Sequence, residues 1–597
     1  MSRADPRHIG IGRSPSTRIV RFALVAAVLF LLVLKYRLLP LININWDEFR
    51  FLSRIYELDR GELGSAFQTF HVELFRWLLG TPGNEADQVI AGRTFAFALR
   101  LASSYLIFLI GRRLLGVTGA LFAVLASLGF SHLMRHGEAF RADPIIACLF
   151  LATAALLILR ISSPSAVALA AVALATASLV SIKATVYLPT VGLIFAAHLT
   201  APGRAVVLRR FGLFCAVGLV AYFGLQTLHA AALPATGVEA APAATALAAR
   251  IGRSVLGAAP FLDALAETLR FDQAFWLLLL AGGAIALTEA LRGAGEARRH
   301  GIILLGFLLP LGALFFYRNT FAYFYATVIP AAALVAGVVP ARVERWLRRR
   351  PALAGAVVAG LGIPLALTGW RCYNLLDVDT VAPQRRVLEA VWEVFPNAVP
   401  YIDRCSMVAA YPKVGPFMST FVLSGYRARG ASIMPALVRE RQPVFVLANV
   451  EGLHLALPWE ATERSPHRLL RQDFEYLKAH YVHHWGPLWV AGIDLTAGTG
   501  GAIEFELPVT GLYTVETRGG LELDGKLVEN GAAVRLVAGP HSVRSRDTPK
   551  PVTLRYGDHL PRPVGPPPDG PLFIDLGFRD VELRAGTTGM LLEGTIP

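Results

Sequence analysis

Two short segments carry side chains that could do chemistry. In Asn45-Trp46-Asp47-Glu48-Phe49-Arg50-Phe51, two adjacent carboxylates follow a long apolar run. In Arg135-His136-Gly137-Glu138-Ala139-Phe140-Arg141-Ala142-Asp143-Pro144, ionisable groups crowd between two apolar runs. A carboxylate such as Asp47 or Asp143 can take a proton from a hydroxyl, and an arginine such as Arg141 can hold a phosphate. The two segments therefore predict group transfer on a substrate that carries phosphate.

Both aspartates also fit a structural role. Asp47 could cap the N-terminus of a helix, with Glu48 favouring the helix dipole from the first turn. Asp143 precedes Pro144, a residue that often opens a helix, and could be a second cap. The pattern alone leaves capping and chemistry open at both positions.

Further cations lie within or beside apolar runs. Arg93 and Arg100 are seven residues apart and share one helix face, and Lys183 separates two paired runs. An ionisable residue inside a membrane span marks a functional site by default, although it can also snorkel or pair with an acid. Cations and carboxylates beside an apolar wall suit a substrate with a phosphate head and a lipid tail.

The composition indicates which elements position these residues. Of 597 residues, 54% are hydrophobic and 17% are charged, whereas soluble proteins carry about 25% charged residues. A disordered or wholly soluble chain is therefore excluded, and apolar runs of about 20 residues predict membrane spans. We expect about eleven spans, near 20–40, 92–111, 117–134, 143–160, 165–182, 185–201, 211–230, 272–291, 301–317, 321–340 and 352–370.

The distribution of charge predicts the topology. Arginines are the main charged residues of the N-terminus and of every second short loop between predicted spans. The positive-inside rule therefore puts the N-terminus in the cytoplasm. Asp47, Asp143, Lys183 and Arg318 then share the outer side with the C-terminal part. The same distribution accounts for much of the net charge of +14 and argues against nucleic-acid binding. Of the four cysteines, Cys372 and Cys405 could form a disulfide in an oxidising compartment.

The chain divides into three predicted parts. Residues 1–370 are predicted to form the transmembrane domain, which carries the candidate catalytic residues. Residues 371–490 mix a helical pattern with a buried-strand run and predict an α/β domain. Residues 491–597 alternate between apolar and polar residues, with a hairpin signal at Asp524-Gly525, and predict a β-sandwich. Tyr401-Ile402-Asp403-Arg404 has no assigned role.

The order of these features resembles the GT-C glycosyltransferases, and more narrowly the protein O-mannosyltransferase and lipid A aminoarabinose transferase superfamily. The resemblance rests on Trp46–Phe51 after the first span, on Phe140–Pro144 opening the fourth, and on Ser181-Ile182-Lys183. Arg318, Tyr323-Phe324-Tyr325 and Pro330 near the tenth span complete it. It covers roughly residues 20–340 and implies a membrane-bound enzyme that moves a sugar, with inversion, from a polyprenyl-phosphate carrier on the periplasmic face.

The resemblance also implies roles for single residues. Asp47 would be the catalytic base or an acceptor-site carboxylate, with Glu48 beside it, and Asp143 would bind a divalent metal or position the acceptor. The donor would be held by a set of cations and tyrosines: Arg50, Arg93, Arg100, Arg141, Lys183, Arg318, Tyr323 and Tyr325.

The chain departs from the superfamily in its first loop. Relatives carry a Lys-Pro element there, whereas this chain reads Phe70-His71-Val72-Glu73-Leu74, and Phe51 replaces a tyrosine. His71 and Glu73, with Glu138, are candidate ligands for a divalent metal, with imidazole favouring zinc and carboxylates favouring magnesium or manganese.

The sequence thus predicts a multi-pass protein of the bacterial inner membrane with a periplasmic C-terminal part. Its partners would be the lipid bilayer, a polyprenyl-phosphate-linked sugar and an envelope acceptor, with a lipid glycan or lipopolysaccharide favoured over protein. Two other classes remain open: a lipid-linked substrate flippase or secondary transporter, and a non-catalytic envelope-assembly protein.

Overall fold

The computed structural model describes residues 15–233, 262–376, 379–463, 465–499, 501–546 and 548–573. Within these ranges, nine helices are long and apolar enough to cross a membrane, and two shorter apolar helices accompany them. The long ones cover Pro15–Leu38, Glu85–Leu115, Ala142–Arg160, Ile182–Leu199, Arg204–Ala231, Gln273–Arg292, Glu296–Phe315, Ala322–Trp346 and Pro351–Leu375, and the shorter ones Val117–Leu128 and Pro164–Val180. Each of the eleven predicted spans overlaps one of these helices, as expected of a multi-pass membrane protein.

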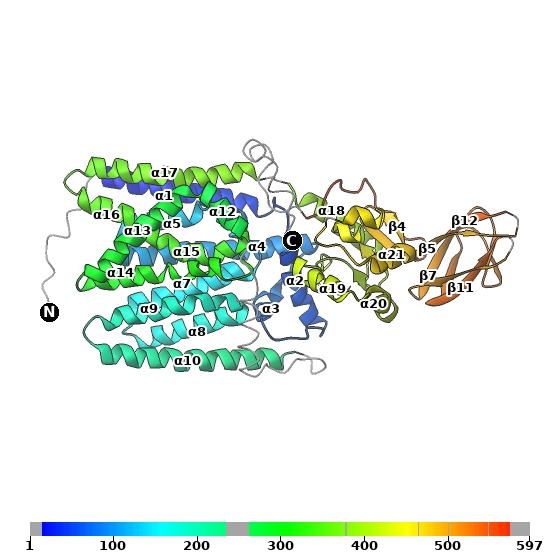
Figure 1. The fold of residues 1–597 in the computed structure, drawn as a ribbon, viewed down its shortest axis with the longest axis horizontal. Helices are drawn as coiled ribbons and strands as arrows, with labels where there is room; N and C mark the ends of the chain where they lie inside the picture. The colour runs from blue at the N-terminus through cyan, green and yellow to red at the C-terminus, as the bar shows by residue number, and fades with distance from the viewer. Residues whose placement is uncertain are drawn as a thin grey trace.

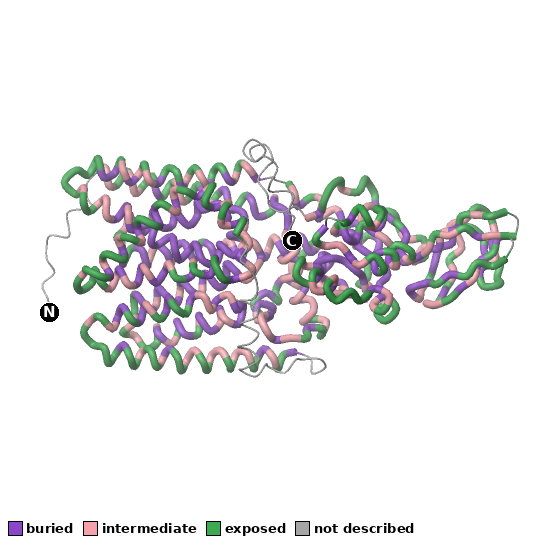
Figure 2. The backbone as a smooth tube through the Cα atoms, viewed as in Figure 1, coloured by how far each residue is buried: buried purple, intermediate pink, exposed green. Residues whose placement is uncertain are grey.

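The apolar helices lie side by side along the long axis of the molecule, and the C-terminal part extends from one end of the bundle (Figure 1). The outer helices α1 (Pro15–Leu38), α10 (Arg204–Ala231) and α17 (Pro351–Leu375) expose much of their length (Figure 2). Their exposed side chains are apolar, including Phe22, Val220 and Leu367, because lipid rather than water is the solvent for this surface. The inner helices include α4 (Glu85–Leu115), α5 (Val117–Leu128), α7 (Ala142–Arg160) and α15 (Tyr325–Ala336).

Further helices belong to the bundle. They are α8 (Pro164–Val180), η4 (Ile182–Tyr187), α9 (Leu188–Leu199), α12 (Leu262–Phe271), α13 (Gln273–Arg292), α14 (Glu296–Gly306), η5 (Leu309–Phe315), η6 (Ala322–Phe324) and α16 (Val338–Trp346).

Short helices cover the end of the bundle that faces the C-terminal part (Figure 1). The loop after α1, called the first outer loop after its predicted side, forms α2 (Trp46–Asp59), α3 (His71–Phe75) and η3 (Arg76–Gly80). The loop after α5, called the second outer loop in the same way, forms α6 (Ser131–His136). The apolar face of α2 is buried through Phe49, Leu52 and Ile55. These loops bring the two acidic segments to the same end of the bundle.

The α/β part follows α17. Its helices are α18 (Ala382–Val394), α19 (Thr420–Arg429), α20 (Met434–Arg441) and α21 (Arg471–His480), with the short turns η7 (Glu451–Leu453) and η8 (Trp459–Thr462). Strand β1 (Tyr401–Ile402) pairs in parallel with β2 (Lys413–Val414) on one side and with β3 (Phe445–Leu447) on the other.

The remaining strands pair in antiparallel fashion, and all but the first of them, at 481–485, contribute to a separate hydrophobic core. They are β4 (Tyr481–Trp485), β5 (Leu488–Ala497), β6 (Ile503–Leu507), β7 (Gly511–Thr517), β8 (Leu521–Leu523), β9 (Lys526–Val528), β10 (Ala533–Leu536), β11 (Gly539–Arg544) and β12 (Lys550–Tyr556). Strand β5 pairs with β3 and β4 at its start and with β12 further along. The sequence boundary at 490/491 therefore falls inside a strand that the two parts share.

Candidate active site

The start of α2 exposes the Asp47 carboxylate. Asn45, not Asp47, caps this helix, because its side chain accepts the backbone N–H of Asp47 and the carboxylate of Glu48 accepts the backbone N–H of Asn45. The capping interpretation of Asp47 is therefore wrong, and its side chain is left 27% exposed. At α7, Arg141 occupies the cap position and Asp143 lies in the first turn, so Asp143 is not the cap either.

Arg141 joins the two aspartates. Its guanidinium donates one hydrogen bond to Asp47 and another, at 3.4 Å, to Asp143. Lys183 of η4 donates to Asp143 at 2.7 Å, and the Thr327 hydroxyl of α15 donates to the same carboxylate oxygen at 3.0 Å. Four segments that are far apart in the sequence thus meet at one cluster, joined by hydrogen bonds to Arg141 and Asp143.

An aromatic ring forms one wall of this cluster. The Tyr323 ring of η6 lies 3.6 Å from the guanidinium carbon of Arg141 and 4.9 Å from the Lys183 ammonium. A cation over an aromatic face is attracted by the ring quadrupole, so Tyr323 fixes the direction of both cations. The predicted group of Asp47, Asp143, Arg141, Lys183 and Tyr323 is therefore assembled in the structure.

The two carboxylates differ in what they can do. Asp143 is 2% exposed and accepts hydrogen bonds from three side chains, which suits a group that holds cations in place. Asp47 has one such donor among the described residues and remains partly open to solvent. Of these two carboxylates, Asp47 is therefore the one that solvent can reach.

The two cations keep capacity for a ligand. Burial lowers the pKa of Arg141, but the carboxylates of Asp47 and Asp143 outweigh this and raise it, so the guanidinium is permanently charged. Its bonds to the two aspartates use two of its N–H groups, and Lys183 uses one in its ion pair. The remaining donors are of the kind that binds phosphate oxygens.

Glu48 lies apart from this cluster. It is 1% exposed, accepts two hydrogen bonds from Arg93 at 2.8 and 2.6 Å, and accepts the backbone N–H of Phe140 at 2.7 Å. Burial raises the pKa of Glu48, but Arg93 and the backbone donors lower it more, so the net shift is downward. The structure therefore makes Glu48 a link between the two outer loops, whereas the sequence favoured a catalytic role.

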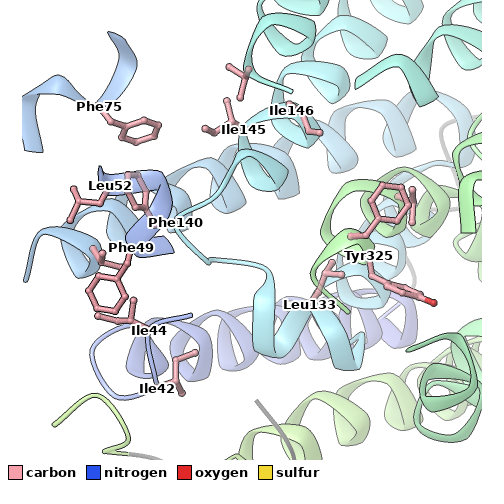
Figure 3. Close-up of a cluster of buried hydrophobic side chains, with 14 of the residues drawn as sticks. Ile42, Ile44, Phe49, Leu52, Phe75, Leu133, Phe140, Ile145, Ile146 and Tyr325 are labelled. Atoms are coloured by element: carbon pink, nitrogen blue, oxygen red, sulfur yellow. The ribbon is translucent and has the colours of Figure 1, made fainter. Parts of the chain in front are cut away.

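Phe140 is the second link between the loops. Its ring packs among Phe49, Leu52 and Phe75 (Figure 3), with its centre 4.9 Å from that of Phe75. A Cβ atom at Gly92 of α4 would lie 2.5 Å from the Phe140 ring, so only glycine permits this approach. The packing fixes the position of the neighbouring Arg141.

Arg100 and Glu138 form another buried pair. Arg100 donates to Glu138 at 3.2 Å and to the Gly137 carbonyl at 2.9 Å, and Lys35 of α1 donates to the same carboxylate at 3.1 Å. Arg93 also donates to the backbone carbonyls of Leu39, Ile42 and Asn43. Arg93 and Arg100 therefore hold the outer loops against the bundle, and neither contacts the Asp47–Asp143 cluster in the described residues.

Three other predicted donor-binding residues lie outside the cluster. Arg50 turns along α2 to bond Glu57 at 2.6 Å. The Arg318 guanidinium stacks on Phe421 of α19, 5.1 Å from the ring centre. Tyr325 is buried against Phe130 and His132. The predicted Arg318–Tyr323–Tyr325 group is thus divided, and only Tyr323 lies at the cluster.

The predicted metal ligands do not converge. His71 stacks on Phe51 with ring centres 3.6 Å apart, Glu73 bonds His229 at 2.9 Å, and Glu138 is engaged by Lys35 and Arg100. Within the described ranges, no group of three or more His, Cys, Asp or Glu side chains could hold a metal ion. Among the described residues, these three candidate ligands therefore do not form a metal centre. All four cysteines are free, so Cys372 and Cys405 are not bonded to each other.

Sequence reasoning missed several positioning residues. Thr327 and Gly92 lie inside apolar helices and carry no signal of their own. Arg404, in the unassigned Tyr401–Arg404 motif, lies with its guanidinium carbon 3.9 Å from the Trp46 ring centre. That motif had no role assigned from the sequence, and nothing in its local pattern indicated a contact between the C-terminal part and the first outer loop.

No protein-family profile matches the chain, and no curated protein matches it by sequence. Solved structures do. ArnT from Cupriavidus metallidurans, bound to undecaprenyl phosphate, is 14% identical with a TM-score of 0.48 over 72% of this chain and 93% of its own. The Archaeoglobus fulgidus oligosaccharyltransferase tethered with an acceptor peptide is 11% identical with a TM-score of 0.48, over 77% and 72%.

A third solved structure is the arabinosyltransferase EmbB from Mycobacterium smegmatis, which is 14% identical with a TM-score of 0.38, over 94% of this chain and 66% of its own. All three proteins are GT-C glycosyltransferases, the class that the sequence resembles.

Proposed function

We propose that this protein is an inverting glycosyltransferase that moves a sugar from a polyprenyl-phosphate carrier to a hydroxyl of an envelope acceptor on the periplasmic face. The observation that carries the proposal is the contrast between two linked carboxylates. Asp47 is partly exposed with one side-chain donor, and Asp143 is buried among Arg141, Lys183 and Thr327. A base, an anchor for cations and a phosphate-binding pair are the parts that such a transfer needs.

The proposed reaction is one displacement. The acceptor oxygen attacks the anomeric carbon of the sugar while its proton passes to the Asp47 carboxylate. The bond between the anomeric carbon and the phosphate oxygen breaks, and polyprenyl phosphate leaves with the electron pair. Free N–H groups of Arg141 and Lys183 stabilise the negative charge that develops on that oxygen. A single displacement inverts the configuration at the anomeric carbon.

The apolar surroundings support a lipid-linked donor. The cluster lies at the end of a bundle of apolar helices, and an apolar groove of about 680 Å³ runs along the bundle between α12, α13 and η5. A lipid glycan or lipopolysaccharide is the proposed acceptor, in preference to protein.

The test uses the purified full-length protein with a panel of polyprenyl-phosphate sugars and envelope acceptors. Wild type is expected to transfer one of the sugars, and Asp47→Asn to lower the rate by about 100- to 10,000-fold, the usual contribution of a general base. Asp143→Asn is expected to lose transfer because Arg141 and Lys183 lose their anchor. Transfer that survives both substitutions would refute these roles. Lipid movement across vesicles without transfer from any donor would identify a flippase instead.

A further inference from the structure

A second large cavity lies between the α/β part and the first outer loop. Its volume is about 760 Å³, within the range of about 300–1,000 Å³ typical of ligand sites. Trp46 and Arg404 form part of its wall. The rest comes from three segments: Ala448–Glu451 with His454, Ser465–His467, and Gly486-Pro487 with Pro567–Phe573.

The topology of the sheet points to the same place. Strands β1 and β3 are parallel neighbours, and the cavity lies where both of them end, at Arg404 after β1 and at Ala448–Glu451 after β3. Open α/β sheets bind ligands outside the carboxyl ends of their parallel strands, because the loops diverge there. The cavity and the strand order are independent observations, and they coincide.

Hydrogen bonds hold the wall of this cavity in a fixed shape. The Asp403 carboxylate accepts the backbone N–H groups of Cys405, Ser406 and Met407 and the Asn449 side-chain amide. The Asn449 oxygen in turn accepts the backbone N–H of Arg404 at 3.0 Å. The loops after β1 and β3 are therefore tied together, which gives the unassigned Tyr401–Arg404 motif a role.

The cavity reaches the proposed catalytic loop through Trp46. The Arg404 guanidinium stacks on Trp46, and Phe573 meets the same ring edge-on with centres 6.2 Å apart. The Asn43 side chain donates to the Leu572 carbonyl at 2.9 Å, so the C-terminal segment is anchored to the first outer loop. Trp46 immediately precedes Asp47, so a ligand in the cavity lies beside the backbone that carries the base.

The lining identifies the chemistry of the ligand. It holds one arginine against two carboxylates, Glu451 and Asp569, which disfavours an anionic headgroup. Burial and the Arg404 charge lower the pKa of His467 to about 3, so its imidazole is neutral at physiological pH. Aromatic rings from Trp46 and Phe573 accompany amide, hydroxyl, imidazole and carboxylate groups. A neutral ligand with apolar faces and many hydroxyls matches this set.

We infer that the cavity at the ends of β1 and β3 binds the carbohydrate chain of the acceptor and presents its terminal hydroxyl to Asp47 past Trp46. The inference rests on the proposed function for the identity of the ligand as the acceptor, and on the cavity itself for carbohydrate binding. The cavity residues are distinct from the Asp47–Asp143 cluster, so binding and transfer can be separated by experiment.

The test measures glycan binding without transfer. Full-length protein in detergent is applied to an array of neutral oligosaccharides of the bacterial envelope. Glu451→Ala with His454→Ala removes two exposed lining groups, and we expect affinity for the bound glycan to fall at least about tenfold, the effect of about 1.4 kcal/mol. Glu460→Ala, a solvent-exposed glutamate outside the lining, is the matched control and keeps wild-type affinity.

The localisation is tested by hydrogen exchange. The bound oligosaccharide is expected to protect backbone amides of residues 448–454. Asp47→Asn keeps both binding and protection, so loss of transfer with retained glycan binding separates the base from the cavity. If wild type transfers no sugar but binds a glycan through Glu451 and His454, the proposed function fails and the carbohydrate site stands. Binding of no glycan, affinity unchanged in the double variant, or occupation by a peptide instead would overturn the inference.

Discussion

The Arg93 guanidinium donates two hydrogen bonds to the Glu48 carboxylate, at 2.8 and 2.6 Å, with both side chains almost fully buried. Because Glu48 also accepts the backbone N–H of Phe140, this pair joins the helix that carries Asp47 to the loop that carries Arg141. The contact between the two acidic segments therefore depends on a pair that does not itself touch the cluster.

Replacing Glu48 by Gln is expected to destabilise the fold. The amide keeps the size of the side chain, but Arg93 becomes a buried charge without a counter-ion, so the free energy of unfolding falls by about 3–5 kcal/mol. Unfolding in detergent, followed by circular dichroism against denaturant, measures the loss. Asp47→Asn is the control, because its carboxylate is partly exposed. Equal stability of the two variants would contradict the linking role of Glu48.

Adding one methyl group at Gly92 is expected to reduce transfer. In Gly92→Ala, the new Cβ would lie 2.5 Å from the Phe140 ring, so the ring and the adjacent Arg141 must move. Overpacking of this kind costs about 1–3 kcal/mol, and the shift of Arg141 lowers the transfer rate as well. The transfer assay and the thermal midpoint report the two effects.

Gly218→Ala is the matched control for that substitution. Gly218 also lies inside an apolar helix, but the nearest atom to its Cβ would be 3.8 Å away, and alanine is the better helix former. Its activity and stability should equal or exceed those of wild type. A fully active Gly92→Ala would show that Phe140 does not position Arg141.

The sequence predicted the cluster because each of its members lies at the outer end of a span. The length of each apolar run predicts a membrane span, and the positive-inside rule places Asp47, Asp143 and Lys183 on one side of the membrane. The same reasoning could not predict that Tyr323 lies at the cluster and Tyr325 does not. Both residues lie near the start of the same predicted span, but their side chains face different neighbours. Nor could it distinguish the arginine at the cluster, Arg141, from the two that hold the loops, Arg93 and Arg100. The difference lies in their partners, which are Glu48 for Arg93 and Glu138 for Arg100.

Arg50 illustrates a missed local signal. It lies seven residues before Glu57, and that spacing places the two side chains on one face of α2, where they form an ion pair. The resemblance to known transferases predicted that Arg50 binds the donor, although the Glu57 carboxylate lies on the same helix face and pairs with it. The cavity beside Trp46, by contrast, depends on contacts between residues more than 350 positions apart, which no local pattern encodes.

Replacing Lys183 by Ala is expected to weaken binding of the lipid carrier. A charged hydrogen bond contributes about 1.5–3 kcal/mol, so affinity for undecaprenyl phosphate should fall by a factor of about 10–100. Asp143 keeps Arg141 and Thr327 as donors, so the fold survives. Lys183→Arg retains the charge and should recover part of the affinity.

The probe for that prediction is undecaprenyl phosphate titrated against protein in detergent, followed by intrinsic fluorescence. Lys478→Ala, at an exposed lysine of the C-terminal part, is the control and should bind as wild type does. Unchanged affinity in Lys183→Ala would remove Lys183 from the phosphate site and leave Arg141 as its cation.

His71 is expected to make the folded protein sensitive to acid. Its ring is 3% exposed and stacks on Phe51, and burial lowers its pKa to about 3, compared with about 6.5 in an unfolded chain. Between these two pH values, His71 is protonated in the unfolded chain and neutral in the folded protein. The free energy of unfolding therefore stays constant above pH 6.5 and falls as the pH drops towards 3, by up to about 1.4 kcal/mol per pH unit.

His71→Phe keeps the stacked ring and removes the titration. Between pH 7.5 and pH 5, the free energy of unfolding of wild type should fall by about 2 kcal/mol more than that of this variant. His483→Phe, at an exposed histidine, should leave the acid-dependent loss in place. Denaturant unfolding from pH 7.5 to pH 4.5 measures all three proteins. Parallel curves for wild type and His71→Phe would mean that His71 is protonated in the folded state, and the stacked, neutral ring would then be the wrong description of this loop.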